Sequence, residues 1–325
     1  MKYTFIKRVA ALSLGAALCA PAFSAQWPEK PVTFVVPSAA GGSPDVLSRL
    51  ITTQLAKDTG GNFVIENKPG GAGNIGISII KRATPDGYTV GYGNINTLAV
   101  NRSLFKTLPY DVDKDLVPVS HMFDLYNVLI VPADSPVKDM QGLIDLAKKS
   151  PGKLSYGASG VGTTGHMGGE LFKSMAKIDV LFVPYNGGPA AMQDLLGGRL
   201  DFIFANSSEV IPLIKSGKVR PLGVSSMKRL DLLPDVPTLD EQGLKGYETI
   251  AWGGVVAPAG TPPDVVNKLN AAIDQALKSP DVQRGLATMG ATAVGGSPEA
   301  FKQMIDKETQ KWAQIIDTAG IEKLD

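Results

Sequence analysis

Four short loops rich in glycine and small polar residues are where this sequence has the means to bind a ligand. They span residues 37–43, 69–74, 159–164 and 185–189, and each follows an apolar run and precedes a helical pattern. Such a loop presents unpaired backbone N–H groups at the positive end of a helix dipole, which favours an anion. Any one loop is better explained as an ordinary turn. Four together indicate a shared cleft, because open α/β sheets bind ligands at the carboxyl ends of their strands.

None of the four loops contains Lys or Arg. An anion bound there would be held by backbone dipoles and by Ser, Thr and Asn side chains. A buried Arg–carboxylate pair would be stronger, but its charges are costly to desolvate. Neutral donors therefore suit selective and reversible binding.

Two stretches match the spacing Gly-x-Gly-x-x-Gly, at residues 71–76 and 160–165. A dinucleotide site also needs an acidic residue at the end of the next strand. Asp86 and Asp179 instead precede their next strands. The spacing therefore does not predict a nucleotide cofactor.

Catalytic and metal-binding patterns are weak. The chain has two histidines, His121 and His166, with no clustered ligands of the kind that zinc needs. Val161 stands where a nucleophile elbow around Ser159 would need glycine. His166 lies seven residues after Ser159, so capping or packing explains it better than a catalytic pair. We expect no enzyme activity, no cofactor and no metal.

Alternating strands and helices must position these loops, as in a βαβ architecture with parallel sheets. Ser43 is the expected N-cap of the first helix, with Pro44 at its first position. Residues 117–119 and 128–131 are expected to form a β pair, and the last helices to pack back on the first part of the chain. The other predicted strands are 32–36, 63–66, 89–92, 154–156, 181–183, 202–204, 219–224 and 249–257, and the predicted helices are 46–55, 75–80, 143–147, 167–175, 190–196, 261–277 and 301–315.

The N-terminus has the three parts of a secretory signal. Lys2, Lys7 and Arg8 form a basic region, residues 9–20 are apolar, and residues 22–24 offer small residues for cleavage. A membrane anchor would need about 20 apolar residues, and Pro21 ends the run. We therefore predict a signal peptide over residues 1–25 and a periplasmic protein.

Composition excludes several other classes. The single cysteine, Cys19, lies in the predicted signal after Leu18, which does not fit a lipoprotein signal. The mature chain then has no thiol for disulfides, metals or catalysis. Removal of three of the 32 basic residues leaves 29 against 31 acidic ones, a net charge near −2. Nothing here indicates binding to nucleic acid.

Long ordered motifs extend across the whole mature chain. The most extended motif is Val64-Ile65-Glu66-Asn67-Lys68-Pro69-Gly70-Gly71-Ala72-Gly73-Asn74-Ile75-Gly76. Further motifs are residues 27–32, 37–45, 83–89, 108–111, 151–156, 183–185, 194–198, 233–238 and 257–262. Together these stretches resemble the Bug-type receptors, the extracytoplasmic solute-binding proteins of tripartite tricarboxylate transporters.

The resemblance implies a two-lobed α/β fold of the type II periplasmic binding protein kind, with mainly parallel sheets flanked by helices and a ligand cleft between the lobes. It implies domain 1 over residues 26–126 plus 250–325, domain 2 over 127–249, and a hinge near Asn127 and Thr249. It implies a monomer that binds a small organic carboxylate and docks on the membrane subunits of the transporter. The implied ligand-binding residues are Ser38, Ala39, Ala40, Gly41, Gly42, Asn94, Ser159, Thr163, Thr164, His166, Tyr185, Asn186 and Asn206.

Two positions depart from the family pattern. Ala205 stands before Asn206 where the family often has Asp, so an acidic partner for a ligand ammonium is absent there. Asn186 follows Tyr185 where a longer side chain is common. The sequence leaves two other functions open: a binding protein that signals to a membrane sensor kinase, and an exported enzyme on the same scaffold.

Overall fold

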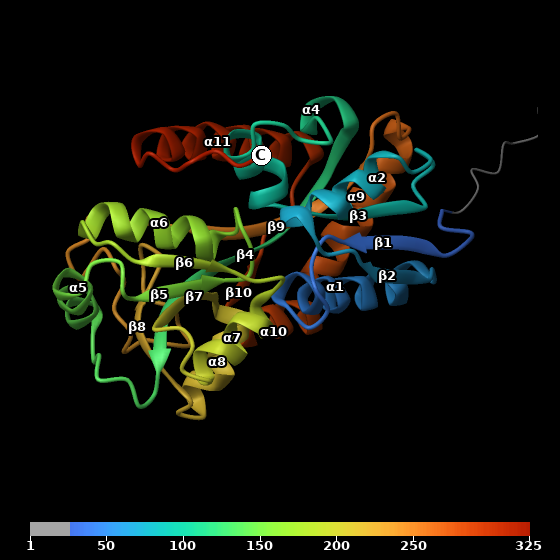
Figure 1. The fold of residues 1–325 in the computed structure, drawn as a ribbon. Coiled ribbons are helices and arrows are strands. Elements are labelled where there is room, and N and C mark those ends of the chain that lie inside the picture. The colour runs from blue at the N-terminus through green and yellow to red at the C-terminus, as the bar shows by residue number, and fades with distance from the viewer. Residues whose placement is uncertain (1–26) are drawn as a thin grey trace, which may run out of the picture.

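The computed structural model describes residues 27–325 as two lobes that share one ten-stranded mixed sheet (Figure 1). The strand order is β2-β1-β3-β9-β4-β7-β5-β6, and β8 and β10 also pair with β4. This architecture confirms the predicted two-lobed α/β fold. The predicted signal peptide and Cys19 lie outside the described residues. Within them, no helix combines the length and the apolar character needed to cross a membrane.

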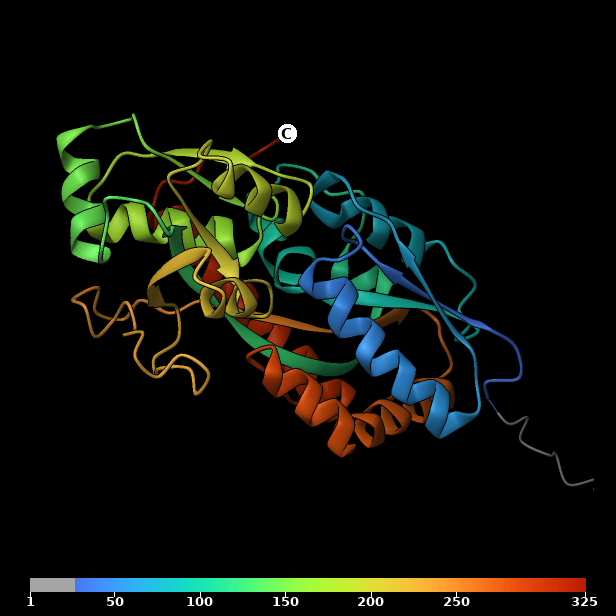
Figure 2. The same ribbon diagram turned by 90° about the horizontal axis from the view of Figure 1, so that it is seen from below.

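Lobe 1 is built from both ends of the described chain, which the blue and orange-red ribbons of Figure 2 show lying together. Along β1, alternate side chains enter opposite cores, as the period of two in a strand requires. Phe34 packs with α1, α9 and α10, whereas Val35 packs with α2 and α11. The elements of lobe 1 are β1 (Val32–Val36), α1 (Ser43–Thr59), β2 (Phe63–Asn67), η1 (Gly71–Gly73), α2 (Asn74–Lys81), β3 (Thr89–Asn94), η2 (Asn96–Val100), α3 (Asn101–Leu104), α4 (Val112–Asp115), β9 (Ile250–Pro258), α9 (Pro263–Lys278), α10 (Pro280–Thr288), β10 (Ala291–Ala293) and α11 (Pro298–Thr318).

Lobe 2 follows the same rule. Along β7, Phe202 and Phe204 enter the core formed with α5 and α6, whereas Ile203 and Ala205 enter the core beside α7 and α8. Strands β5, β6 and β7 are parallel, so their carboxyl ends meet at one edge. The elements of lobe 2 are α5 (Met140–Lys149), β5 (Ser155–Ala158), α6 (Thr164–Ala176), β6 (Leu181–Pro184), α7 (Gly188–Leu196), β7 (Phe202–Asn206), α8 (Ser207–Lys215) and β8 (Val219–Val224).

One long strand, β4 (Leu116–Pro132), runs through both lobes. It pairs with β9 as far as Tyr126 and with β7 from Asn127 onward. The predicted β pair of residues 117–119 and 128–131 is therefore wrong, because both segments belong to this single strand. The polar residues 120, 121, 124 and 127 broke the apolar pattern, but they lie within the continuous strand.

Helices α3, α4 and α10 were not predicted, and two further helices near the site also differ from the prediction. Gly42, not Ser43, is the N-cap of α1, so Ser43 is its first residue and Pro44 its second. Helix α8 was not recognised from its short apolar spacing, which Pro212 interrupts. Both differences affect the site described below.

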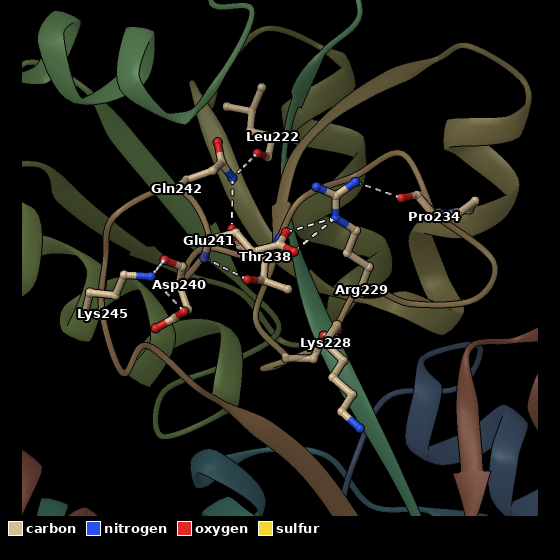
Figure 3. Close-up of polar contacts among 10 residues, drawn as sticks. Leu222, Lys228, Arg229, Pro234, Thr238, Asp240, Glu241, Gln242 and Lys245 are labelled. Atoms are coloured by element: carbon tan, nitrogen blue, oxygen red, sulfur yellow. Dashed lines mark hydrogen bonds and ion pairs between the residues drawn. The ribbon is translucent and has the colours of Figure 1, made fainter.

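Residues 225–249 connect β8 to β9 with little regular structure, yet polar contacts order this stretch (Figure 3). Thr238 and Glu241 cap each other's backbone N–H groups at 2.8 and 2.9 Å. Arg229 donates to the Glu241 carboxylate and to the Pro234 carbonyl. The second connection between the lobes is therefore a fixed segment of lobe 2 and not a loose linker.

Candidate functional site

A cavity of about 270 Å³ lies between the lobes, at the carboxyl ends of β1, β3, β5, β6 and β7. This is where open α/β sheets bind ligands. Parts of all four glycine-rich loops line the cavity. Among the predicted ligand-binding residues, those on its wall are Ser38, Ala39, Gly42, Asn94, Ser159, Thr163, Thr164, Tyr185, Asn186 and Asn206.

The α6 end of the cavity is built entirely within lobe 2. Thr163 is the N-cap of α6: its hydroxyl donates to the Gly160 carbonyl at 2.7 Å and accepts from the His166 N–H at 3.5 Å. Gly165 lies so close to β7 that a Cβ there would stand 2.4 Å from the Phe204 carbonyl oxygen. Contacts within the protein therefore hold the start of α6 against the sheet, and no ligand is needed to position it.

His166 does not line the cavity but supports it from behind. It is buried, stacks near Phe182, and its Nδ1 accepts from the Gly162 N–H at 3.1 Å. Burial lowers the pKa of His166 to about 4, which outweighs the opposing effect of Glu170. The imidazole is thus neutral, and His166 is not among the lining residues, so its predicted contact with the ligand stays a prediction. Ala40 and Gly41 are also not among the residues that line the cavity.

The predicted polar side chains divide into two groups. Several are already engaged: Tyr185 donates to Asp194, Asn206 donates to Ser43, and the Asn94 amide oxygen accepts from Thr97. The Thr163 hydroxyl also donates its proton, to the Gly160 carbonyl, which leaves it no donor for a ligand in this arrangement. Four of the predicted polar side chains on the wall make no hydrogen bond to any residue in the range 27–325: Ser38, Ser159, Thr164 and Asn186.

Glu209 is a wall residue that the sequence analysis missed. Within the described chain it is the single charged residue on the cavity wall, so an acidic group lies at the cavity although position 205 holds alanine. Its carboxylate accepts from the Ser43 N–H and hydroxyl, and burial raises its pKa despite those bonds. The spacing Asn206-x-x-Glu209 is that of a capping box and marked a helix start that apolar periodicity did not. Ser43, Asn96 and Trp252 are further wall residues outside the prediction.

Comparison with known proteins gives the site its context. The model of the tripartite tricarboxylate transporter family receptor matches residues 47–321. This chain belongs to that family. It is a solute-binding receptor of the Bug type, as the motifs indicated. Protein BugT of Bordetella pertussis is 33% identical over 306 residues, which cover 94% of each chain.

Solved structures of the family share the fold of this receptor. An adipate-bound protein of R. palustris is 38% identical, with a TM-score of 0.89 over 92% of this chain and all of that one. MatC of Rhodopseudomonas palustris, solved with bound malate, is 32% identical, with a TM-score of 0.85 over 89% of this chain and all of that one. The periplasmic binding protein BugD is 34% identical, with a TM-score of 0.88. These relatives are binding proteins.

Proposed function

We propose that this receptor captures a small organic carboxylate in the cavity between its lobes and delivers it to the membrane subunits of a tripartite tricarboxylate transporter. The observation that carries the proposal is the set of free donors at the α6 end of the cavity. Ser159 and Thr164 have unengaged hydroxyls beside a helix N-terminus, and such an end attracts anions. The adipate and malate bound to the two relatives have the matching chemistry.

The carboxylate would be bound by neutral groups. Among residues 27–325, no Lys or Arg lines the cavity, so hydrogen bonds and helix dipoles would replace the hydration shell of the anion. A hydrogen bond to a charged group is worth roughly 1.5–3 kcal/mol. Ser159, Thr164, Ser38 and Asn186 are the side chains that we propose as donors, together with the backbone of the glycine-rich loops.

The proposed molecule is a periplasmic monomer after removal of residues 1–25, and it binds its ligand without chemical change. Its domains would be residues 26–126 plus 250–325 and residues 127–249. The change of partner along β4, from β9 to β7 between Tyr126 and Asn127, supports this division. Contacts from both lobes would favour the closed arrangement, because they exist together only when the cleft is shut.

Native mass spectrometry of freshly purified protein tests the function directly. We expect a retained species with the mass of a mono-, di- or tricarboxylate, which is recovered unchanged after long incubation. A thermal-shift panel of adipate, malate, aromatic acids, amino acids and sugars then ranks the classes. Stabilisation by sugars or cationic amino acids, with no response to any carboxylate, would contradict the proposal.

A further inference from the structure

Helix α1 begins at the cavity without a side-chain cap from its own lobe. Its cap comes from lobe 2: the Glu209 carboxylate accepts from the Ser43 N–H at 3.1 Å and from the Ser43 hydroxyl at 2.9 Å. The first N–H groups of a helix need such partners, and negative charge is favoured there. Glu209 therefore caps α1 across the cleft, between residues 166 positions apart in the sequence.

The Ser43 hydroxyl is fully used in this contact. It donates to Glu209 and accepts from Ser208 at 2.7 Å and from Asn206 at 3.0 Å, which exhausts one donor and two lone pairs. Asn206 also accepts from the Asn127 amide at 3.0 Å, and Asn127 is where β4 passes from one lobe to the other. The Ser43–Glu209 contact is thus connected through Asn206 to Asn127, where β4 passes between the lobes.

Glu209 also lies against the start of α7, whose N-cap, Gly187, makes no side-chain cap. A Cβ at Gly188 would stand 2.2 Å from the second carboxylate oxygen of Glu209. Only glycine at position 188 leaves room for the carboxylate as it is seated. One side chain therefore occupies the space between the N-termini of α1 and α7.

We propose that Glu209 is a positioning residue for closure of the cleft. It caps α1 only when the lobes are together, and so stabilises the closed form before any ligand contributes. It also fills the anion-favouring end of α1, which leaves the α6 end for the ligand carboxylate. The assignment of the ligand carboxylate to the α6 end rests on the proposed function. The role of Glu209 in closing the cleft does not.

Interlobe distances measured by electron spin resonance test the closure directly. Cysteines introduced at Thr53 of α1 and Lys215 of α8, both exposed, would carry one spin label on each lobe. The chain after residue 25 has no native cysteine, so labelling is specific. In ligand-free protein we expect Glu209→Ala and Ser43→Ala to shift the distances to longer values. Glu209→Gln, which keeps an acceptor, should shift them less. Distributions identical to the parent protein in both alanine variants would overturn the proposal.

Gly188→Ala is the matched variant, because it leaves Glu209 and Ser43 in place. Its methyl group would displace the carboxylate, so we expect longer distances in this variant too. When Gly188→Ala is combined with Glu209→Ala, the interlobe distances should not change further, because the carboxylate that the new methyl group would contact is absent. An equal additional opening in the Glu209→Ala background would show that the effect does not pass through Glu209, and would overturn the proposal. Circular dichroism confirms that each variant is folded.

Calorimetry with adipate and malate separates this proposal from the proposed function. If both bind, Glu209→Ala should weaken them several-fold through loss of closure, and unchanged affinity would count against the proposal. If neither carboxylate binds, the proposed function is in doubt, but the ligand-free distances still decide the role of Glu209.

Discussion

The N-termini of α1 and α6 face the same cavity but are completed in opposite ways. Helix α6 is capped by Thr163 of its own loop and is packed against β7. Helix α1 receives its cap from Glu209 in the other lobe. The N-terminus of α6 is therefore capped within a single lobe, whereas the N-terminus of α1 is capped only when both lobes meet.

This difference shows that similar loops are not equivalent anion sites. Both loops are rich in glycine and hydroxyl residues, and both precede helices that lie at strand ends. Whether such a loop can bind an anion depends on which protein groups already hydrogen-bond to the N-terminus of its helix. At α6 the Thr164 hydroxyl is left without a protein partner, whereas at α1 a protein carboxylate occupies the position that a ligand anion would take.

The largest expected effect concerns the neutral imidazole behind α6. Because the folded pKa of His166 is about 4 and its ordinary value is 6.5, the unfolded chain binds the proton more tightly between these values. Stability is then complete above about pH 6.5 and falls as the pH drops toward 4, by about 3 kcal/mol in total. Denaturant unfolding at a series of pH values measures this.

His166→Asn is the control for that measurement, since the Asn amide oxygen can accept from Gly162 without titrating. Carboxylates that do not interact with position 166 affect both proteins alike, so the difference between their pH profiles reports on His166 together with its neighbour Glu170. Parallel profiles between pH 6.5 and 4 would show that the α6 end does not depend on a neutral His166.

The next largest effect should be on ligand affinity, which we expect to depend on side chains at the N-terminus of α6. Thr164→Ala and Ser159→Ala should each weaken binding of the retained carboxylate by about one to two decades, because each loses a hydrogen bond to a charged group. The melting temperature of the free protein should hardly move, since neither hydroxyl has a protein partner within the described chain. Calorimetry checks the affinity, with Thr53→Ala on the exposed side of α1 as the control. Full affinity in both variants would remove the α6 end from the site.

A pair of glycines tests how firmly each end is held. Gly165→Ala would bring a methyl group to 2.4 Å from a backbone oxygen of β7, so we expect a loss of roughly 1–3 kcal/mol in the free energy of unfolding. Gly42→Ala meets its nearest atom at 3.6 Å and keeps an ordinary φ of −79°, and should cost only about 0.5 kcal/mol. Denaturant midpoints compare them. Equal losses would mean that α6 is no more tightly packed than α1.

The smallest effect is the local cap. Thr163→Ala should lower the free energy of unfolding by about 1 kcal/mol, the usual value of an N-cap, and Thr163→Ser should restore most of it. Thermal unfolding of the ligand-free protein checks both. An alanine variant as stable as the parent would show that the hydroxyl, at 3.5 Å from the His166 N–H, contributes little to the cap.

The sequence alone was enough for the order of most helices and strands and for the loops that line the cavity. These features are local: a period of two or of 3.6 in apolar residues, and glycines followed by a helical pattern, are written within a few neighbouring positions. Strand β1 and the loop before α6 are examples, and the family motifs extend through the same loops. Helix α8 was missed because Pro212 interrupts its nine residues, although Val210, Ile211, Leu213 and Ile214 keep a helical spacing.

Only the tertiary structure decided which of those residues are free to bind. Thr163 and Tyr185 are polar residues in suitable loops, yet their protons are donated to Gly160 and Asp194. Glu209 and Ser43 are 166 positions apart, so no local pattern relates them. Hydrogen bonding saturates: once a donor or a helix end has a partner, it has little left to offer a ligand. Which groups become hydrogen-bonded partners depends on which distant segments the fold brings together. The packing of the two lobes therefore decides it.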